Sequence, residues 1–208
     1  MRWKIALSKL ILNGLWVSSR TLIEATVTPG MGGVIFFGDS ITHWGRWELL
    51  FPTISTRNFG ISGERTDQLL ARLEPIFTCR PEKLFILIGT NDLGLGISIE
   101  QTAANVDLMI SRLCEQLPPE SIFLQAVMPR ARKFSTRIKA LNARYREIAL
   151  QHAIAYVDLF AHFDDGTGQL ISRYTEDHLH LNGAGYLAWR ERIGPLVLGT
   201  SSVTGENG

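Results

Sequence analysis

The chain has 208 residues, of which 45% are hydrophobic and 20% are charged, and this composition excludes a disordered or fibrous protein. Its 21 Lys and Arg residues against 20 Asp and Glu residues give a formal net charge of +1, which lacks the basic excess expected of a nucleic-acid-binding protein. A chain of this length can bury most of its surface in one core without a disulfide framework or a structural metal. We therefore expect one compact domain with small-molecule partners, and we interpret the widely separated Cys79 and Cys114 as free thiols.

Residues 1–33 differ in character from the rest of the chain. Their four Lys and Arg residues against Glu24 give a formal charge of +3 and leave −2 for residues 34–208. Several apolar residues fall near one face of a predicted amphipathic helix: Leu7, Leu10, Ile11, Leu15 and Leu22. We expect a basic extension that docks on the protein body, on a second subunit of a homodimer, or on a membrane surface.

The same segment has a weak signal-peptide pattern, but Lys9 and Asn13 interrupt its apolar region and no clear cleavage site follows. No apolar run in the chain is long enough to span a bilayer. We therefore favour a cytoplasmic protein, with a signal peptide or membrane anchor as the alternative.

From Val34 onward, short apolar runs alternate with longer segments of helical periodicity. The first run, Val34–Phe37, is rich in β-branched and aromatic residues and ends at a glycine, which is typical of a buried parallel strand. Four further strands are predicted, the first of them weaker: Thr56–Phe59, Leu84–Ile88, Ile122–Val127 and Ile154–Leu159. Apolar residues recur at helical spacing in four segments: Glu64–Phe77, Ser98–Leu117, Phe134–His152 and Asn182–Leu198.

This alternation predicts an α/β protein, a three-layer α/β/α sandwich around a doubly wound, mostly five-stranded parallel sheet of the flavodoxin-like kind. The predicted domain covers residues 34–198, between the extension at 1–33 and a flexible tail at 199–208. Ligands of such folds bind at the carboxyl ends of the strands, so the loops that follow the strands should line any site.

Residues with catalytic chemistry fall in these loops. The first predicted strand leads into Gly38-Asp39-Ser40-Ile41-Thr42, and the third leads into Gly89-Thr90-Asn91-Asp92. Asp177 and His180 lie three positions apart before the last predicted helix, so they face the same way on one turn. Serine-based acyl transfer needs a nucleophile, an imidazole base, a carboxylate that orients it and donors for the oxyanion. Each segment alone is commonly turn or cap chemistry, but their joint occurrence at strand ends favours catalysis.

Four short blocks resemble those of the SGNH, or GDSL-type, esterase and lipase superfamily. They are Gly38–Thr42, Asn58–Gly63, Gly89–Asp92 and Asp177–His180. The resemblance covers about residues 34–198 and is nearest to the branch with the platelet-activating-factor acetylhydrolase subunits and the thioesterase/lysophospholipase enzymes.

The resemblance implies Ser40 as nucleophile, His180 as base and Asp177 as its orienting carboxylate. It also implies an oxyanion hole made by the backbone amides of Ser40 and Gly60 with the side-chain amide of Asn91. Glycine allows close backbone approach and an asparagine amide is a neutral donor, which suits both positions.

Several other residues near these blocks have competing interpretations. His178 is an alternative base, but its side chain should diverge from that of the adjacent Asp177, so we favour His180. His43 is either a substrate contact or a structural residue at a helix start. Ser62 is interpreted as a turn residue, because Glu64 occupies the last glycine position of a G-x-S-x-G elbow.

Aromatic and basic residues also follow the predicted strands. Trp44 and Trp47 either form the wall of an acyl pocket or belong to the core. Arg130, Arg132 and Lys133 follow the fourth predicted strand, where they either favour an acidic substrate group or form a solvated loop. We retain Arg130, with His43 and Trp44, as a candidate substrate-binding residue.

Metal and nucleotide cofactors find little support in the sequence. Asp177, His178 and His180 are ligand types, but no spaced third histidine, HExxH or CxxC pattern accompanies them. The short Gly94-Leu95-Gly96 run lacks the third glycine of a dinucleotide-binding loop. We therefore predict no metal and no cofactor.

The leading hypothesis is a serine esterase that cleaves a carboxylic ester or thioester through an acyl-enzyme. The spacing between Met128 and Ser172 leaves no segment for a large lid, which favours an open groove and short to medium acyl groups. The alternatives are a sugar O-acetyl esterase or an acyltransferase with the same residues, and a non-catalytic binding protein on the same fold.

Overall fold

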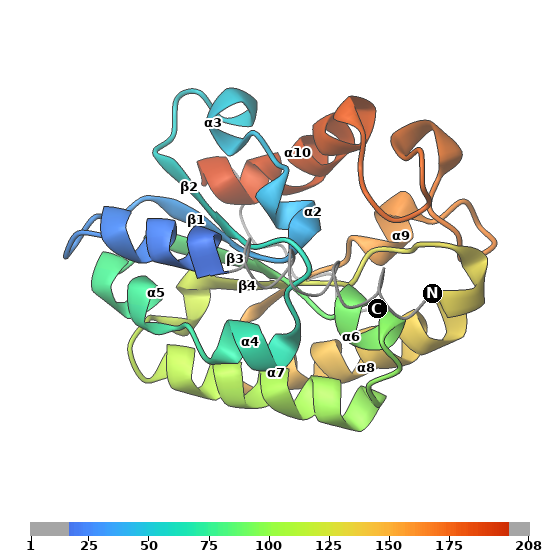
Figure 1. The fold of residues 1–208 in the computed structure, drawn as a ribbon, viewed down its shortest axis with the longest axis horizontal. Coiled ribbons are helices and arrows are strands. Elements are labelled where there is room, and N and C mark those ends of the chain that lie inside the picture. Colours follow the sequence, from blue (N-terminus) through green and yellow to red (C-terminus); the bar gives the residue numbers. More distant parts are fainter. Residues whose placement is uncertain (1–16, 200–208) are drawn as a thin grey trace.

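The computed structural model describes residues 17–199, shown in Figure 1. Four of the five predicted apolar positions of the amphipathic extension, Leu7, Leu10, Ile11 and Leu15, lie outside the described residues, as does the predicted tail from residue 200 onward. Within residues 17–199, no helix is both long and apolar enough to cross a bilayer.

A five-stranded parallel sheet with the order β2-β1-β3-β4-β5 forms the centre of the molecule. Its strands are β1 (Val34–Gly38), β2 (Thr56–Gly60), β3 (Lys83–Leu87), β4 (Ile122–Gln125) and β5 (Ala155–Val157). This is the strand order of flavodoxin-like doubly wound folds, and the predicted fold class is confirmed.

Helices cover both faces of the sheet (Figure 1). The lower layer in this view contains α4 (Thr66–Leu70), α5 (Glu74–Cys79), α6 (Thr90–Gly94), α7 (Ile99–Cys114) and α8 (Ser135–Gln151). The upper layer contains α2 (Ser40–His43), α3 (Trp47–Leu50) and α10 (Gly183–Leu198), with α9 (Phe160–Phe163) beyond the end of β5. Three single 3₁₀ turns lie in the connections: η1 (Pro119–Ser121), η2 (Arg132–Phe134) and η3 (Ser172–Tyr174).

The central strands are apolar throughout because both faces of the sheet are covered. Every residue of β1 and β4 is buried. Phe36, Phe85 and Phe123 stack across β1, β3 and β4, with ring centroids 5.4 and 4.5 Å apart. In register, Gly38 pairs with Gly60 on one side and Leu87 on the other, so the loops that follow β1, β2 and β3 open at one edge of the sheet.

The prediction of a single helix over Glu64–Phe77 is wrong. The segment forms α4 and α5, and residues 71–73 interrupt the two. Pro75 is accepted in the first turn of α5 because its missing N–H needs no partner there, whereas in the interior of one long helix it would break the hydrogen-bond ladder. Glu64 and Arg65 precede α4 and belong to the loop after β2.

The other predicted elements are found, and only the last two strands are shorter than expected. β4 ends at Gln125 rather than Val127, and β5 spans only Ala155–Val157. The predicted helix starts at Ser98 and Asn182 are N-caps, whose side chains accept from Gln101 N and Gly185 N. Both cysteines are free thiols, as predicted.

Residues 17–26 are helical and lie beside the edge strand β2. Ile23 joins the hydrophobic core, whereas Val17 and Leu22 are exposed. Leu22, predicted on the apolar face, is therefore mostly in solvent. The expected break follows at once, because Gly30, Gly32 and Gly33 all have positive φ.

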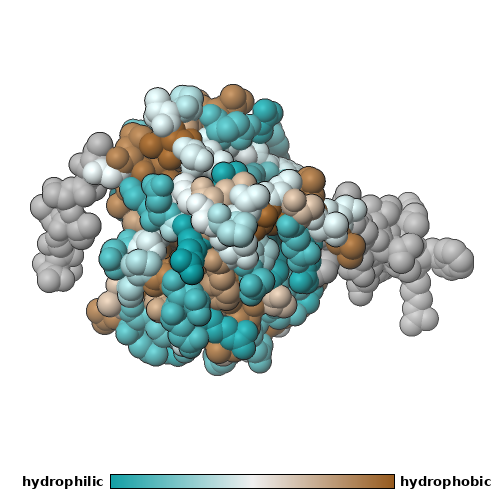
Figure 2. Space-filling view, turned by 90° about the vertical axis from the view of Figure 1, so that its left-hand side faces the viewer, coloured by the Kyte–Doolittle hydropathy of each residue, from teal (hydrophilic) through white to brown (hydrophobic). Residues whose placement is uncertain are grey.

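An apolar hollow lies between α3 and the second half of α10, lined by residues that include Phe51, Pro195 and Leu198. Figure 2 shows the side of the molecule that is on the left in Figure 1, where apolar side chains gather at the upper left among polar neighbours. Because α10 begins just after His180 and runs away from it, this hollow lies apart from the predicted catalytic residues.

Candidate active site

Ser40 stands at a sharp strand-to-helix transition. β1 ends at Gly38 and α2 begins at Ser40, with the intervening Asp39 as N-cap: its Oδ1 accepts from Ile41 N at 3.0 Å. A Cβ at position 38 would lie 2.1 Å from the carbonyl oxygen of Leu87, so only glycine allows this close strand approach. The turn therefore places the Ser40 hydroxyl at the carboxyl edge of the sheet, where the sequence predicted a site.

Side chains from other elements hold the single turn of α2 in place by bonding its carbonyl groups. Tyr186 Oη donates to Ile41 O at 2.7 Å, and Trp47 Nε1 donates to Thr42 O at 3.1 Å. Trp47 is 1% exposed and stacks on Phe36 with centroids 3.6 Å apart. Trp47 is therefore a core residue, and its alternative role as an acyl-pocket wall is wrong.

The three predicted catalytic side chains form a continuous hydrogen-bonded chain. Ser40 Oγ lies 3.0 Å from His180 Nε2, and His180 Nδ1 lies 2.6 Å from Asp177 Oδ2. Ser40 and His180 are 140 positions apart in the sequence, and the sheet topology brings them together. The arrangement is that of a nucleophile, its base and the carboxylate that orients the base.

Asp177 is fixed as an acceptor by the loop that carries it. Its Oδ1 accepts from the backbone N–H groups of Leu179 and His180 at 2.9 and 2.7 Å. Partial burial raises the pKa of Asp177, but the hydrogen bonds from His180 and Leu179 outweigh it and hold the pKa at about 2. The carboxylate is therefore ionised at neutral pH, as an orienting group requires.

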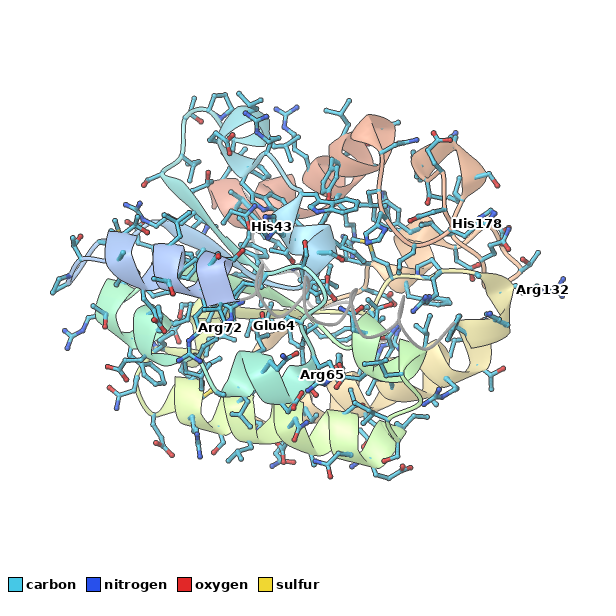
Figure 3. The ribbon with its side chains drawn as sticks, viewed as in Figure 1. His43, Glu64, Arg65, Arg72, Arg132 and His178 are labelled. Atoms are coloured by element: carbon cyan, nitrogen blue, oxygen red, sulfur yellow. The ribbon has the colours of Figure 1, made fainter. Side chains whose placement is uncertain are left out.

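The aromatic ring of Trp44 packs directly on the base. Its centroid lies 4.2 Å from that of His180, with the rings 28° from parallel, and half of its surface remains exposed. Of the three residues predicted to bind substrate, Trp44 packs on His180 of the predicted catalytic triad, and Arg130 lies near the triad. His43 is the last residue of α2, and its backbone carbonyl accepts from Asn58 Nδ2 of β2 at 2.8 Å, which favours its structural interpretation (Figure 3).

His178 points away from Ser40. Its backbone has a left-handed φ of 57°, its side chain is exposed, and Figure 3 shows it at the outer side of the loop before α10. Its divergence from Asp177 agrees with the choice of His180 as base. No cluster of three His, Cys, Asp or Glu side chains that could hold a metal ion occurs within residues 17–199.

Asn91 is anchored beside the loop that follows β2. It lies in the first turn of α6, and its Nδ2 donates to the Glu64 carbonyl at 2.8 Å. An amide nitrogen carries two hydrogens, so this bond leaves one of them available and fixes the plane of the group. Gly89, the residue before α6, has a positive φ of 116°, and a Cβ there would lie 2.7 Å from Tyr145 Oη. Only glycine therefore fits at this position.

The geometry argues against Gly60 as an oxyanion donor. Its N–H already donates to Asn58 Oδ1 at 2.9 Å, and a Cβ there would lie 2.3 Å from His43 N, so its glycine identity is explained by packing. Gly63, three residues later, is exposed and sits at φ of 79° in the turn Ile61–Glu64, closed by Glu64 N and Ile61 O at 3.3 Å. This turn also contains Ser62, as predicted.

A buried ion pair ties this turn to the core. Arg72 Nε donates to Glu64 Oε1 at 2.7 Å and Arg72 Nη2 donates to Glu64 Oε2, with side chains that are 1% and 0% exposed. Arg72 Nη2 also donates to Phe59 O at 2.7 Å, and the guanidinium lies over the Phe37 ring. Figure 3 shows Arg72 and Glu64 approaching each other inside the molecule. Sequence reasoning missed this pair, because nothing in the spacing distinguishes these two charges from surface residues.

Two further buried carboxyl groups lie near the nucleophile. Burial is the main cause that raises the pKa of Asp39 to about 7, and the charges of Glu64 and Asp92 add to it against the Ile41 hydrogen bond. Burial also raises the pKa of Asp92, although Thr66 donates both its N–H and its hydroxyl to that carboxylate.

Of the basic cluster after β4, only Arg130 turns inward. Its Nη1 donates to Thr90 O at 3.1 Å, and its guanidinium lies 4.0 Å above the Phe134 ring. Arg132 and Lys133 are exposed, and Figure 3 shows Arg132 at the periphery, directed to solvent.

Comparison with known proteins agrees with this geometry. The model of the GDSL-like Lipase/Acylhydrolase family matches residues 36–188. The chain belongs to this family. The bovine (Bos taurus) platelet-activating factor acetylhydrolase IB subunit alpha1 is 26% identical, over 89% of this chain and 84% of the relative.

Solved structures agree in fold. A Streptococcus pneumonia protein named for platelet activating factor superimposes with a TM-score of 0.86 at 27% identity, covering 95% of this chain and 99% of the other. A GDSL-like lipase from Bacteroides thetaiotaomicron gives 0.76 at 25% identity, covering 89% and 98%. The resemblance found in the sequence is confirmed, and this member of the family is a hydrolase that acts on carboxylic esters.

Proposed function

We propose that the chain cleaves a carboxylic ester or thioester through a covalent acyl-enzyme on Ser40, with a preference for short to medium acyl groups. The observation that carries the proposal is the hydrogen-bonded chain from Ser40 through His180 to Asp177, at 3.0 and 2.6 Å.

In the first half-reaction, Ser40 Oγ attacks the ester carbonyl carbon while its proton passes to His180 Nε2. The tetrahedral intermediate collapses, the bond to the leaving alcohol or thiol breaks, and His180 returns the proton to that leaving group. Water then attacks the acyl-enzyme with His180 again as base, which releases the acid and restores the Ser40 hydroxyl. Asp177 stabilises the imidazolium in both halves and stays ionised, in keeping with its lowered pKa of about 2.

The proposed oxyanion hole combines the backbone N–H of Ser40, the free hydrogen of Asn91 Nδ2 and the N–H of Gly63 in place of that of Gly60. Neither backbone amide makes a hydrogen bond within residues 17–199, and Asn91 Nδ2 donates to the carbonyl of Glu64, the residue that follows Gly63. Donors that are fixed before the reaction stabilise the developing charge without reorganisation.

The preference for short to medium acyl groups rests on how open the catalytic residues are. The His180 and Asp177 side chains are 23% and 52% exposed, and half of the Trp44 surface is exposed. An open site buries little of a long acyl chain, and each methylene left in water forgoes about 0.8 kcal/mol of binding.

The test compares Ser40→Ala with the matched control Ser62→Ala, a serine in the nearby turn. With 4-nitrophenyl acetate, butyrate and octanoate, Ser40→Ala should lose at least about 10³-fold in kcat while Ser62→Ala keeps the wild-type value. Diethyl 4-nitrophenyl phosphate should add one phosphoryl group, located by peptide mass spectrometry on Ser40. Near-normal turnover in purified Ser40→Ala, or an adduct on another residue, would reject the nucleophile, and a steady rise in kcat/KM to octanoate would reject the acyl preference.

A further inference from the structure

Arg130 is a half-buried cation without a carboxylate partner. None of the ion pairs within residues 17–199 includes it, although Arg72, Arg65 and Arg146 all have one. Its hydrogen bonds go instead from Nη1 to the backbone and hydroxyl oxygens of Thr90, at 3.1 and 3.3 Å. Nε is buried with no partner, and no acceptor within the described chain bonds to Nη2.

The position of this guanidinium is fixed from three sides. Thr90, which it bonds, immediately precedes Asn91, so the anchor lies at the proposed oxyanion hole. The Phe134 ring packs on its face at 4.0 Å, and its Nη1 lies 3.2 Å from where a Cβ on Gly94 would stand. The Arg130 backbone pairs with Gln169, in the loop that leads toward Asp177. An arginine held in this way loses little side-chain entropy when it binds an anion.

Arg130 lies within electrostatic reach of the two acids that accompany the reacting residues. Burial lowers its pKa, while the negative charges of Asp177 and Asp39 raise it, and these acids flank Ser40 and His180. Neither acid forms an ion pair with the guanidinium, so its free N–H groups remain for another acceptor. Partial desolvation of a permanent cation costs free energy unless an anion or hydrogen bonds compensate it.

We infer that Arg130 binds a carboxylate or similar oxyanion on the substrate, so that the preferred substrates are esters of acidic molecules rather than neutral esters. The inference rests on the proposed function, since it assigns a substrate class to the same site. Arginine suits this role because its planar fork donates two parallel hydrogen bonds to a carboxylate. The carboxylate belongs either to the alcohol side or to the acyl side of the ester.

The test uses two pairs of esters that differ only by a carboxylate and a neutral carboxamide. For the alcohol side the pair is 4-acetoxybenzoate and 4-acetoxybenzamide, and for the acyl side it is the mono-4-nitrophenyl esters of adipate and adipamate. The measured quantity is the ratio of kcat/KM within each pair, which cancels any general loss of activity. In one pair, Arg130→Gln should lower the ratio at least about tenfold, because a hydrogen bond to a charged group is worth that factor or more.

Two variants control for charge and for folding. Arg132→Gln removes an exposed positive charge two residues away and should leave both ratios at the wild-type value. Arg130→Lys keeps the charge but loses the fork, so its ratio should lie between wild type and Arg130→Gln. Calorimetric titration of Ser40→Ala and Ser40→Ala/Arg130→Gln with 4-acetoxybenzoate and mono-4-nitrophenyl adipate compares binding without turnover, and the second variant should bind one of them at least about tenfold more weakly.

The outcomes separate this inference from the proposed function. Equal ratios in wild type and Arg130→Gln for both pairs, or an equal loss in Arg132→Gln, would overturn the role of Arg130 while leaving the esterase intact. Hydrolysis that persists in Ser40→Ala would instead overturn the acyl-enzyme proposal. The pair whose ratio responds identifies the side of the ester that carries the acid.

Discussion

Removal of Arg72 should destabilise the protein and disturb catalysis together. In Arg72→Met, the carboxylate of Glu64, which is 0% exposed, loses its bidentate partner, and Phe59 O loses a 2.7 Å hydrogen bond. Breaking one side of a buried ion pair costs about 3–5 kcal/mol, because the remaining buried charge loses its bidentate partner. For a protein of this size that corresponds to a fall in Tm of about 6–20 °C.

The matched control is Arg65→Met. Arg65 also makes a two-bonded ion pair, with Asp67, but those side chains are 30% and 53% exposed and the pair is worth about 1 kcal/mol or less. Urea unfolding followed by tryptophan fluorescence measures both variants, since Trp47 and Trp189 are buried. A double variant, Glu64→Gln/Arg72→Met, should recover at least about 2 kcal/mol relative to Arg72→Met, because it removes the buried charge.

Catalysis supplies an independent readout of the same change. The Glu64 carbonyl anchors Asn91 Nδ2 at 2.8 Å, so movement of Glu64 should misplace this proposed oxyanion donor. We expect a lower kcat for 4-nitrophenyl acetate in Arg72→Met at a temperature where the variant is still folded. If Arg72→Met is no less stable than Arg65→Met, the reasoning about the buried pair is refuted.

Three further predictions concern the site. Asn91→Ala should lower kcat about 10²–10³-fold with a smaller change in KM, and an effect on KM alone would make Asn91 a ground-state contact. The pKa of Asp39 is raised to about 7, so the folded state holds this proton more tightly than the unfolded state. The free energy of unfolding should therefore fall as pH rises from about 4 to 7. Urea titrations at several pH values should show this fall in the wild type and a flatter dependence in Asp39→Asn. Trp44→Ala should lower kcat about tenfold or less, since the ring only packs on His180; loss comparable to that of His180→Ala would show that the indole acts on the reaction itself.

Periodicity predicted the sheet well and the short elements poorly. β1 and residues 84–87 of β3 are continuous apolar runs that are buried, and such runs are visible in a sequence. By contrast, α2 and α6 are single turns of four and five residues, too short to show a period of 3.6. The break between α4 and α5 could have been predicted from Pro75, whose ring is incompatible with a helix interior.

The three predicted catalytic residues could be found from the sequence, whereas the residues that surround them could not. Ser40, Asp177 and His180 were found because each lies in a short motif at a strand or helix end. The choice between Gly60 and Gly63 depends on which amide already has an acceptor, and only the hydrogen bond to Asn58 Oδ1 reveals that. The inward turn of Arg130 and the outward turn of Arg132 are likewise decided by tertiary packing on Thr90 and Phe134.

The loop at residues 175–180 has a consequence for how the chain tolerates insertions and deletions. The Asp177 carboxylate accepts hydrogen bonds from the backbone N–H groups of Leu179 and His180 and contacts the His180 imidazole. The orienting carboxylate and the base are therefore held together by bonds within four consecutive residues. Length changes in surface connections elsewhere, such as the turn at residues 165–168, leave that internal geometry untouched. A single residue added or removed between Asp177 and His180 should displace the imidazole from its carboxylate, because this spacing sets the 2.6 Å contact between them. Natural and engineered variation in length should therefore avoid this loop.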